Sequence, residues 1–118
     1  MVSFAEIWID AWNRRDVPAI LEHFSEDAQF LSPMAQSLIG LKVVKGRRQI
    51  AKYWRAALDH VVQLQFRLDH VVWDEERREL IIIYEATLNS DRKRACEIMQ
   101  FDASGRVMKG EALYGKAL

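Results

Sequence analysis

The sequence predicts a single α+β domain in which a curved antiparallel sheet wraps around three N-terminal helices. Apolar residues in the first half of the 118-residue chain recur at intervals of three and four, which is the helical period. The second half contains four strand-length segments separated by turn-like stretches. Helices followed by an antiparallel meander are typical of an α+β domain, and the length suits one domain over residues 1–118.

Three helices are predicted in the first half. The first begins with the capping-box motif Ser3-Phe4-Ala5-Glu6 and runs to about Asn13. The second is short, with Asp16 as its N-cap and Pro18 in its first turn. The third spans residues 47–61, and its apolar face carries Ile50, Tyr53, Trp54, Ala57, Leu58 and Val61.

Turn-forming residues indicate which loops and strands lie between and after these helices. Residues 25–27 predict a turn and 28–31 a brief strand. Residues 32–45 include Pro33 and Gly40 without a sustained period, so we expect a long loop there, lying over the mouth of a pocket. The later strands are predicted at residues 65–73, 79–88, 93–101 and 106–114.

Hairpin turns fix strand register, and register decides which side chains share a face. A two-residue loop at Ser90-Asp91 would set Tyr84 opposite Glu97, and a four-residue loop at 102–105 would set Glu97 opposite Gly110. One face then forms an apolar surface with a single carboxylate at its centre, made by Ile82, Tyr84, Ala95, Glu97, Met99, Met108, Gly110, Ala112 and Tyr114.

The opposite face of the sheet also contains apolar residues, notably Ile81 and Ile83. If the helices cover one face, this other face needs its own partner. We therefore expect a homodimer that packs through the outer face of the sheet, with Cys96 pointing toward that interface.

Composition excludes several classes of partner. Lys plus Arg and Asp plus Glu both number 17, and the basic clusters are scattered among acids, so no nucleic-acid partner is expected. The longest apolar runs are far shorter than the roughly 20 residues that cross a bilayer, so no membrane partner is expected. Acidic Glu6 and Asp10 interrupt the apolar N-terminal residues, which argues against a signal peptide and favours a cytoplasmic protein.

Metal and cofactor sites are not expected either. Cys96 is the only cysteine, so the chain has no internal disulfide and no cysteine-based metal cluster. The histidines lack metal-ligand spacing, and no glycine-rich phosphate loop occurs.

Several motifs together resemble the nuclear-transport-factor-2-like superfamily, in its SnoaL-like and ketosteroid-isomerase-like branch. They occur in the family's order over nearly the whole chain: Ala11-Trp12-Asn13-Arg14-Arg15-Asp16, His23-Phe24-Ser25-Glu26-Asp27-Ala28, Gly46-Arg47-Arg48-Gln49-Ile50 with Tyr53-Trp54, Phe101-Asp102-Ala103-Ser104-Gly105-Arg106-Val107 and Ala112-Leu113-Tyr114-Gly115. The resemblance implies a cone-shaped cystatin-like fold, or α+β barrel, that encloses a pocket. It also implies dimerisation through the sheet.

The resemblance does not extend to the catalytic residues of the known enzymes of this superfamily. Ketosteroid isomerases use an Asp base together with an oxyanion hole made by a Tyr and a protonated Asp. The matching positions hold Ser32, Trp8 and Glu97, and a serine without a partner base cannot take a proton from carbon. Limonene epoxide hydrolases need an Arg-x-Asp pattern on the segment 79–88, which is absent.

The leading hypothesis is a small-molecule-binding protein that holds an apolar or aromatic ligand without a cofactor. The expected ligand-binding residues are Trp8, Ser32, Trp54, Tyr84, Glu97, Met99, Gly110 and Tyr114. The alternatives are a cofactor-free isomerase, cyclase or hydratase that uses Glu97 as acid/base with help from Tyr84, and a dimerisation or assembly module with a vestigial pocket. An ionisable partner beside Glu97 would favour the enzyme, apolar neighbours would favour binding, and a pocket filled by Trp side chains would favour the assembly module.

Overall fold

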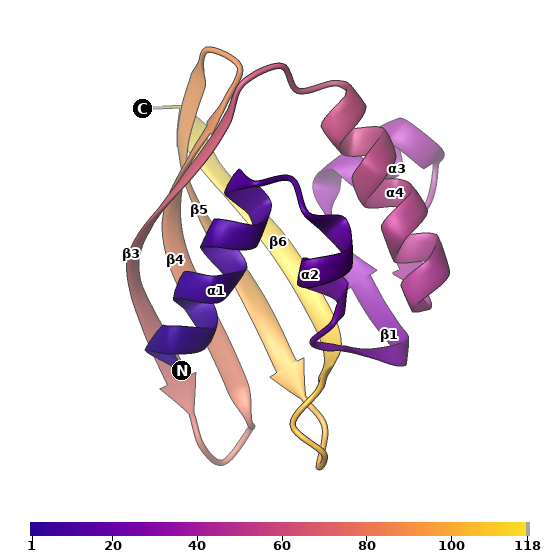
Figure 1. The fold of residues 1–118 in the computed structure, drawn as a ribbon, viewed down its shortest axis with the longest axis vertical. Helices are drawn as coiled ribbons and strands as arrows, with labels where there is room; N and C mark the ends of the chain where they lie inside the picture. The colour runs from indigo at the N-terminus through magenta and orange to yellow at the C-terminus, as the bar shows by residue number, and fades with distance from the viewer. Residues whose placement is uncertain (118) are drawn as a thin grey trace.

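The structure is a computed structural model that describes residues 1–117. Within these residues, four helices and six strands follow one another (Figure 1). Their bounds are α1 Val2–Asn13, α2 Val17–Leu21, β1 Phe24–Leu31, α3 Pro33–Ile39, β2 Val43–Lys45, α4 Arg47–Asp59, β3 Leu64–Asp74, β4 Glu79–Leu88, β5 Asp91–Phe101 and β6 Val107–Ala117.

The six strands form one mixed sheet in the order β2-β1-β6-β5-β4-β3. All neighbouring strands are antiparallel except β1 and β6, which run parallel. The sheet curves around α1, α2 and α4, which lie on its concave side (Figure 1). The predicted α+β class with a curved sheet around N-terminal helices is confirmed, and the parallel β1–β6 pair is an addition to it.

Helices α1 and α2 form for different local reasons. The buried face of α1 includes Trp8 and Trp12, and the helix begins after Met1 without any side-chain cap, so the predicted cap at Ser3 is wrong. The cap of α2 is as predicted, because the Ala19 N–H donates to the Asp16 carboxylate at 3.1 Å. Within residues 1–117, no helix combines the length and the apolar character needed to cross a membrane.

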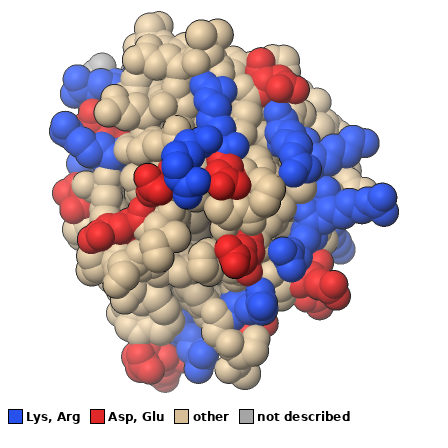
Figure 2. Space-filling view, viewed as in Figure 1, with Lys and Arg blue, Asp and Glu red and all other residues tan. Residues whose placement is uncertain are grey.

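Helix α4 is strongly amphipathic. It follows Gly46, whose φ of 85° is a conformation that glycine adopts without strain. Its inner face buries Tyr53 and Trp54, as the periodicity predicted. Basic side chains gather over its outer side (Figure 2), where Arg48, Lys52 and Arg55 are exposed. The helix ends at Asp59, two residues before the predicted end.

The segment expected to be a long loop is largely ordered secondary structure. Ser32 caps α3 by accepting a hydrogen bond from the Met34 N–H at 3.2 Å, and Gly40 ends the helix at a φ of 72°. Strand β2 then pairs with β1, so the predicted loop over 32–45 is wrong. The predicted turn at 25–27 is also wrong, because β1 begins at Phe24.

The β4–β5 hairpin differs from the predicted register by two residues. Its loop is Asn89-Ser90, and Asn89 has the left-handed φ of 59° that asparagine tolerates. Tyr84 therefore lies opposite Ala95 rather than Glu97. Because side chains alternate with period two, the shift leaves each residue on its predicted face.

Glu97 lies opposite Ile82 on β4 and opposite Ala112 on β6, not opposite Gly110 as predicted. An irregularity between β5 and β6 near Phe101 changes the alternation at the start of β6. As a result Val107 is buried, whereas Met108, predicted on the inner face, is 41% exposed.

Candidate functional site

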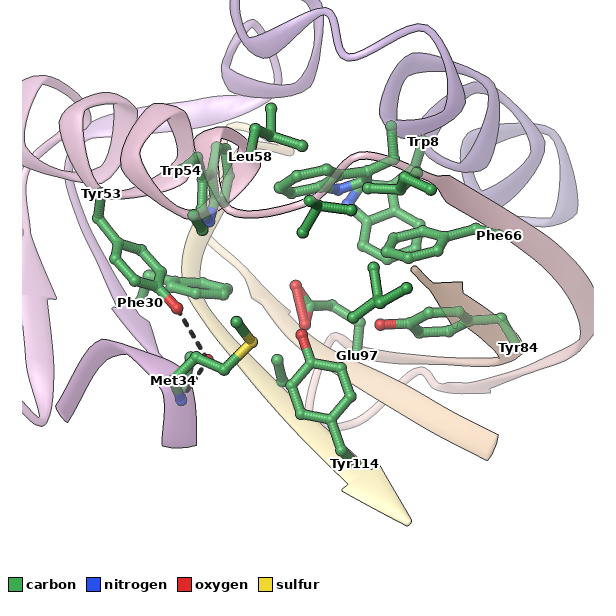
Figure 3. Close-up of a pocket in the computed structure, with 17 residues that line it drawn as sticks. Trp8, Phe30, Met34, Tyr53, Trp54, Leu58, Phe66, Tyr84, Glu97 and Tyr114 are labelled. Atoms are coloured by element: carbon green, nitrogen blue, oxygen red, sulfur yellow. Dashed lines mark hydrogen bonds between the residues drawn. The ribbon is translucent and has the colours of Figure 1, made fainter. Parts of the chain in front are cut away.

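A cavity lies between the helices and the concave face of the sheet (Figure 3). Side chains with a polar atom line it at Trp8, Trp12, Ser32, Tyr53, Trp54, Tyr84, Glu97 and Tyr114. Apolar side chains complete the wall at Phe30, Met34, Ala57, Leu58, Val61, Leu64, Phe66, Leu88 and Ala112. The lining described here includes one carboxylate and no Lys, Arg or His.

The cavity is open on one side and narrow inside. The empty space between the wall atoms is about 530 Å³, including the open mouth. Only about 50 Å³ of that space can be reached by the centre of a water molecule. Since one water needs about 10–15 Å³ of such space, the interior has room for a few waters. A larger ligand requires the side chains of the wall to move outward.

Glu97 lies at the base of this cavity and is 2% exposed. Its Oε2 atom has no hydrogen-bond partner among the described residues. Arg94, a neighbour that could have neutralised it, instead pairs with Asp69 at 2.9 Å on the exposed side of the sheet. The carboxyl group is therefore buried without a compensating cation in the part of the chain that the structure describes.

Burial in these apolar surroundings raises the pKa of Glu97 from 4.5 to about 8, with a further contribution from the nearby Glu111 carboxylate. At pH 7 the group is therefore mainly protonated. A protonated carboxyl group offers one O–H donor together with acceptor oxygen atoms, so it can orient a neutral ligand.

Two tyrosines point toward Glu97. The hydroxyl groups of Tyr84 and Tyr114 are directed at its carboxyl group in Figure 3. Burial is the main cause that raises the pKa of each hydroxyl, and Glu97 adds to the effect in both. Both tyrosines consequently stay protonated at neutral pH and can donate hydrogen bonds.

Ser32 and Tyr53 are joined by a buried hydrogen bond at the edge of the cavity. The Tyr53 hydroxyl donates to Ser32 Oγ at 3.2 Å, and the same oxygen accepts from the Met34 N–H. This arrangement fixes the start of α3 against α4. Ser32 thus has a structural partner, and no histidine lines the cavity beside it in the described chain.

The cavity wall contains three indole groups with unpaired donors. The Nε1 atoms of Trp8, Trp12 and Trp54 are buried and lack an acceptor among the described residues. In contrast, Trp73, outside the cavity, donates from Nε1 to Glu75 at 2.6 Å. An unsatisfied buried donor costs about 1–3 kcal/mol, so three in one wall are a costly arrangement.

Two side-chain clamps tie together elements that carry cavity residues. Asn13 accepts from the Phe66 N–H at 2.7 Å and donates to the Phe66 carbonyl at 3.0 Å, which ties α1 to β3. Arg15 donates to the carbonyls of Val61 and Val62 at 2.8 Å each, which fixes the chain between α4 and β3. Both residues belong to the motif at 11–16, and no sequence pattern predicted these partners.

Of the predicted ligand-binding residues, the structure brings six to the cavity: Trp8, Ser32, Trp54, Tyr84, Glu97 and Tyr114. Met99 and Gly110 do not line it. Met99 is fully buried further along β5, opposite Leu80. Gly110 lies beneath the Phe30 ring, and a Cβ atom at this glycine would come within 3.3 Å of that ring.

Sequence reasoning missed several wall residues. Phe30 and Phe66 were not assigned to the site, although their rings pack against those of Tyr53 and Trp8, with ring centroids 6.0 and 5.9 Å apart. The aromatic character of both residues was the available signal. Met34 was missed because its segment was read as a loop.

The family model of the SnoaL-like domain matches residues 5–109. The chain belongs to the SnoaL-like family. This confirms the resemblance found in the sequence motifs. A search of curated proteins found no match for the chain.

Solved structures of SnoaL-like and related proteins superpose over nearly the whole chain. A SnoaL-like protein of unknown function from Burkholderia thailandensis is 30% identical, with a TM-score of 0.84 over 97% of this chain and 93% of its own. A cystatin-like-fold protein of unknown function from Methylobium petroleophilum is 25% identical, with a TM-score of 0.75 and coverage of 94% and 72%. An NTF2-like protein of unknown function from Burkholderia pseudomallei is 18% identical, with a TM-score of 0.79 and coverage of 97% and 89%, and shows likeness of fold.

Proposed function

We propose that this SnoaL-like protein binds an apolar or aromatic small molecule in the cavity above Glu97. The observation that carries the proposal is the buried carboxyl group of Glu97, which has no partner for Oε2 in the described chain and lies at the base of an apolar cavity with an open side. An unpartnered buried polar group is unusual in proteins unless a ligand or an ordered water completes it. Cavities of this type, mostly apolar with a few polar groups that converge, are the common form of ligand sites.

Ala57 and Ala56 provide a matched test of this site. They are neighbours on α4, but Ala57 lines the cavity while Ala56 lines a groove on the outer side of the helix. A library of neutral ring compounds should contain molecules that raise the melting temperature of the wild type, because a ligand stabilises the state that it binds. Ala57→Phe should abolish this stabilisation and Ala56→Phe should retain it. Equal stabilisation in both variants would contradict binding in this cavity.

A second candidate is a cofactor-free isomerase, cyclase or hydratase. Two observations favour it: the pKa of Glu97 is near 8, and the hydroxyls of Tyr84 and Tyr114 point toward its carboxyl group. General acids and bases work best when their pKa lies near the operating pH. Each compound that binds is incubated with the wild type and with Glu97→Gln, and the products are followed by mass spectrometry and NMR. Conversion by the wild type alone would establish the enzyme, and no conversion by either would leave a binding protein.

We also propose that two copies associate through the outer face of the sheet. This proposal is supported by apolar residues on that face: Val72 is 47% and Leu113 42% exposed, with Ile81, Ile83 and Ile98 partly buried between them. The proposed pocket opens on the other side of the sheet, so a dimer of this kind leaves it accessible. The alternative of an assembly module would require such a dimer together with a cavity that takes no ligand.

A further inference from the structure

The three unpaired indole donors are confined to the cavity wall. Trp8, Trp12 and Trp54 are 3%, 9% and 2% exposed, and the Nε1 atom of each lacks an acceptor in the described chain. The remaining tryptophan, Trp73, stands outside the cavity and has an acceptor in Glu75. Failure to pair an indole N–H is therefore a property of the cavity, not of every tryptophan in the protein.

The chemistry of these groups restricts what can satisfy them. An indole N–H only donates, so the missing partner must be a hydrogen-bond acceptor. Tyr84 and Tyr114 add hydroxyl donors beside Glu97 at the opposite side of the cavity from the helices (Figure 3). The wall thus contains three indole donors that lack an acceptor in the described chain, together with hydroxyl groups that can donate or accept.

The charge of the wall restricts the occupant further. The described lining of the cavity contains no Lys, Arg or His, and its one carboxyl group, that of Glu97, is buried. A ligand carboxylate would enter without a counter-ion, and burying an unpaired charge is strongly unfavourable. Aromatic side chains dominate the wall, with Trp12 and Trp54 in edge contact at 5.2 Å between ring centroids, and they favour a flat apolar body.

We infer that the ligand is a ring compound without an anionic group that carries at least two acceptor oxygens, of the carbonyl or ether type. One oxygen is held by the indole N–H groups from α1 and α4, and the other by the hydroxyl groups around Glu97. This inference rests on the proposed binding function and adds the chemical class of the ligand. Aliphatic side chains of the wall, such as Leu58 and Val61, must move to admit it.

Three compounds of one size test the number of oxygens, and a fourth tests charge. Tetralin, 1-tetralone and 4-chromanone share a two-ring skeleton and carry no, one and two acceptor oxygens, while tetrahydro-2-naphthoate is an anion. We expect affinity to increase by about threefold to tenfold for each oxygen, the usual effect of one added hydrogen bond. The anion should bind more weakly than tetralin at pH 7.

NMR of the ¹⁵N-labelled protein reports which donors respond. The indole N–H signals of Trp8, Trp12 and Trp54 should move on addition of 4-chromanone, while that of Trp73 should remain still as an internal control. Trp8→Phe keeps an aromatic ring but removes one donor, so it should reduce the preference for 4-chromanone over tetralin. Trp73→Phe, the control, should keep the preference for 4-chromanone. If Trp8→Phe does not fold, Trp12→Phe is used in its place.

The outcomes separate the two proposals. Tetralin and 4-chromanone could bind equally well and both move the indole N–H signals of the cavity tryptophans. That result would overturn the inference that the ligand carries acceptor oxygens, but it would support the binding function. Tighter binding of the anion would overturn the exclusion of anionic ligands in the same way. If none of the four compounds moves a cavity indole signal at millimolar concentration, the cavity holds ordered water alone and both proposals fail.

Discussion

Replacement of Glu97 by Gln should change how the stability of the protein depends on pH. In the folded chain the pKa of this carboxyl group is raised from 4.5 to about 8, mainly by burial. Between these two values the folded protein holds a proton that the unfolded chain has released. The free energy of unfolding should therefore be highest below pH 4.5, fall as the pH rises, and level off above about pH 8.

The size of the effect follows from the same pKa difference. Each pKa unit corresponds to about 1.4 kcal/mol. The difference between 4.5 and about 8 then amounts to about 5 kcal/mol as an upper limit. Domains of this size unfold with about 5–15 kcal/mol, so the loss is a large share of the total. Glu97→Gln stays neutral at every pH and should gain about 4 kcal/mol on the wild type between pH 5 and pH 8.

Urea unfolding at several pH values between 4.5 and 9 measures this difference directly. The contributions of all other ionisable groups are shared by both proteins and cancel in the comparison. Glu6→Gln, which alters an exposed carboxylate on α1, should follow the wild-type profile and serves as the control. Parallel profiles for the wild type and Glu97→Gln would refute the argument, because they would mean that Glu97 is ionised in the folded protein.

Three further substitutions test the scaffold and the interface. Ile83→Asp should convert a dimer into a monomer in light scattering because it buries an unpaired charge at the interface, and an unchanged dimer mass would exclude that face. Ser32→Ala removes the cap of α3 and the acceptor of Tyr53, so urea unfolding should show a loss of about 1–2 kcal/mol. Asn13→Ala breaks both hydrogen bonds to Phe66 and should cost about 2 kcal/mol, and an unchanged unfolding midpoint in either case would contradict the assigned contacts.

The inward position of Glu97 could be predicted from sequence even though the register was wrong. The β4–β5 hairpin differs from the prediction by two residues, and a shift of two restores the same face. Met108 shows the limit of this reasoning. The local irregularity near Phe101 changes the alternation by one residue, and no turn signal in the sequence marks it.

Helix α3 was missed for a reason that the sequence itself contains. Pro33 and Gly40 were read as loop residues, yet Ser, Pro and Gly at these positions are the usual start and stop signals of a helix. Seven residues are too few for a clear helical period, so the capping signals were the usable evidence. The parallel pairing of β1 with β6 joins distant segments and has no local signature in the sequence.

The cavity wall was predicted only in part because it depends on how the helices sit on the sheet. Periodicity identified the inner faces that carry Trp8 and Trp54. It could not show that Phe30 would cover Gly110, since that contact joins two strands that are far apart in the sequence. The unpaired state of the indole donors is likewise visible only once all neighbours have been placed.

An NMR pH titration of the Glu97 side-chain carboxyl carbon, assigned with Glu97→Gln, tests the central claim most directly. The protein is proposed to bind an apolar or aromatic ligand above a buried, protonated carboxyl group. This account predicts a titration midpoint near 8, with the group protonated at pH 7. A midpoint near the ordinary value of 4.5 would contradict it, because the carboxyl group would then be ionised and either solvated or paired with a cation.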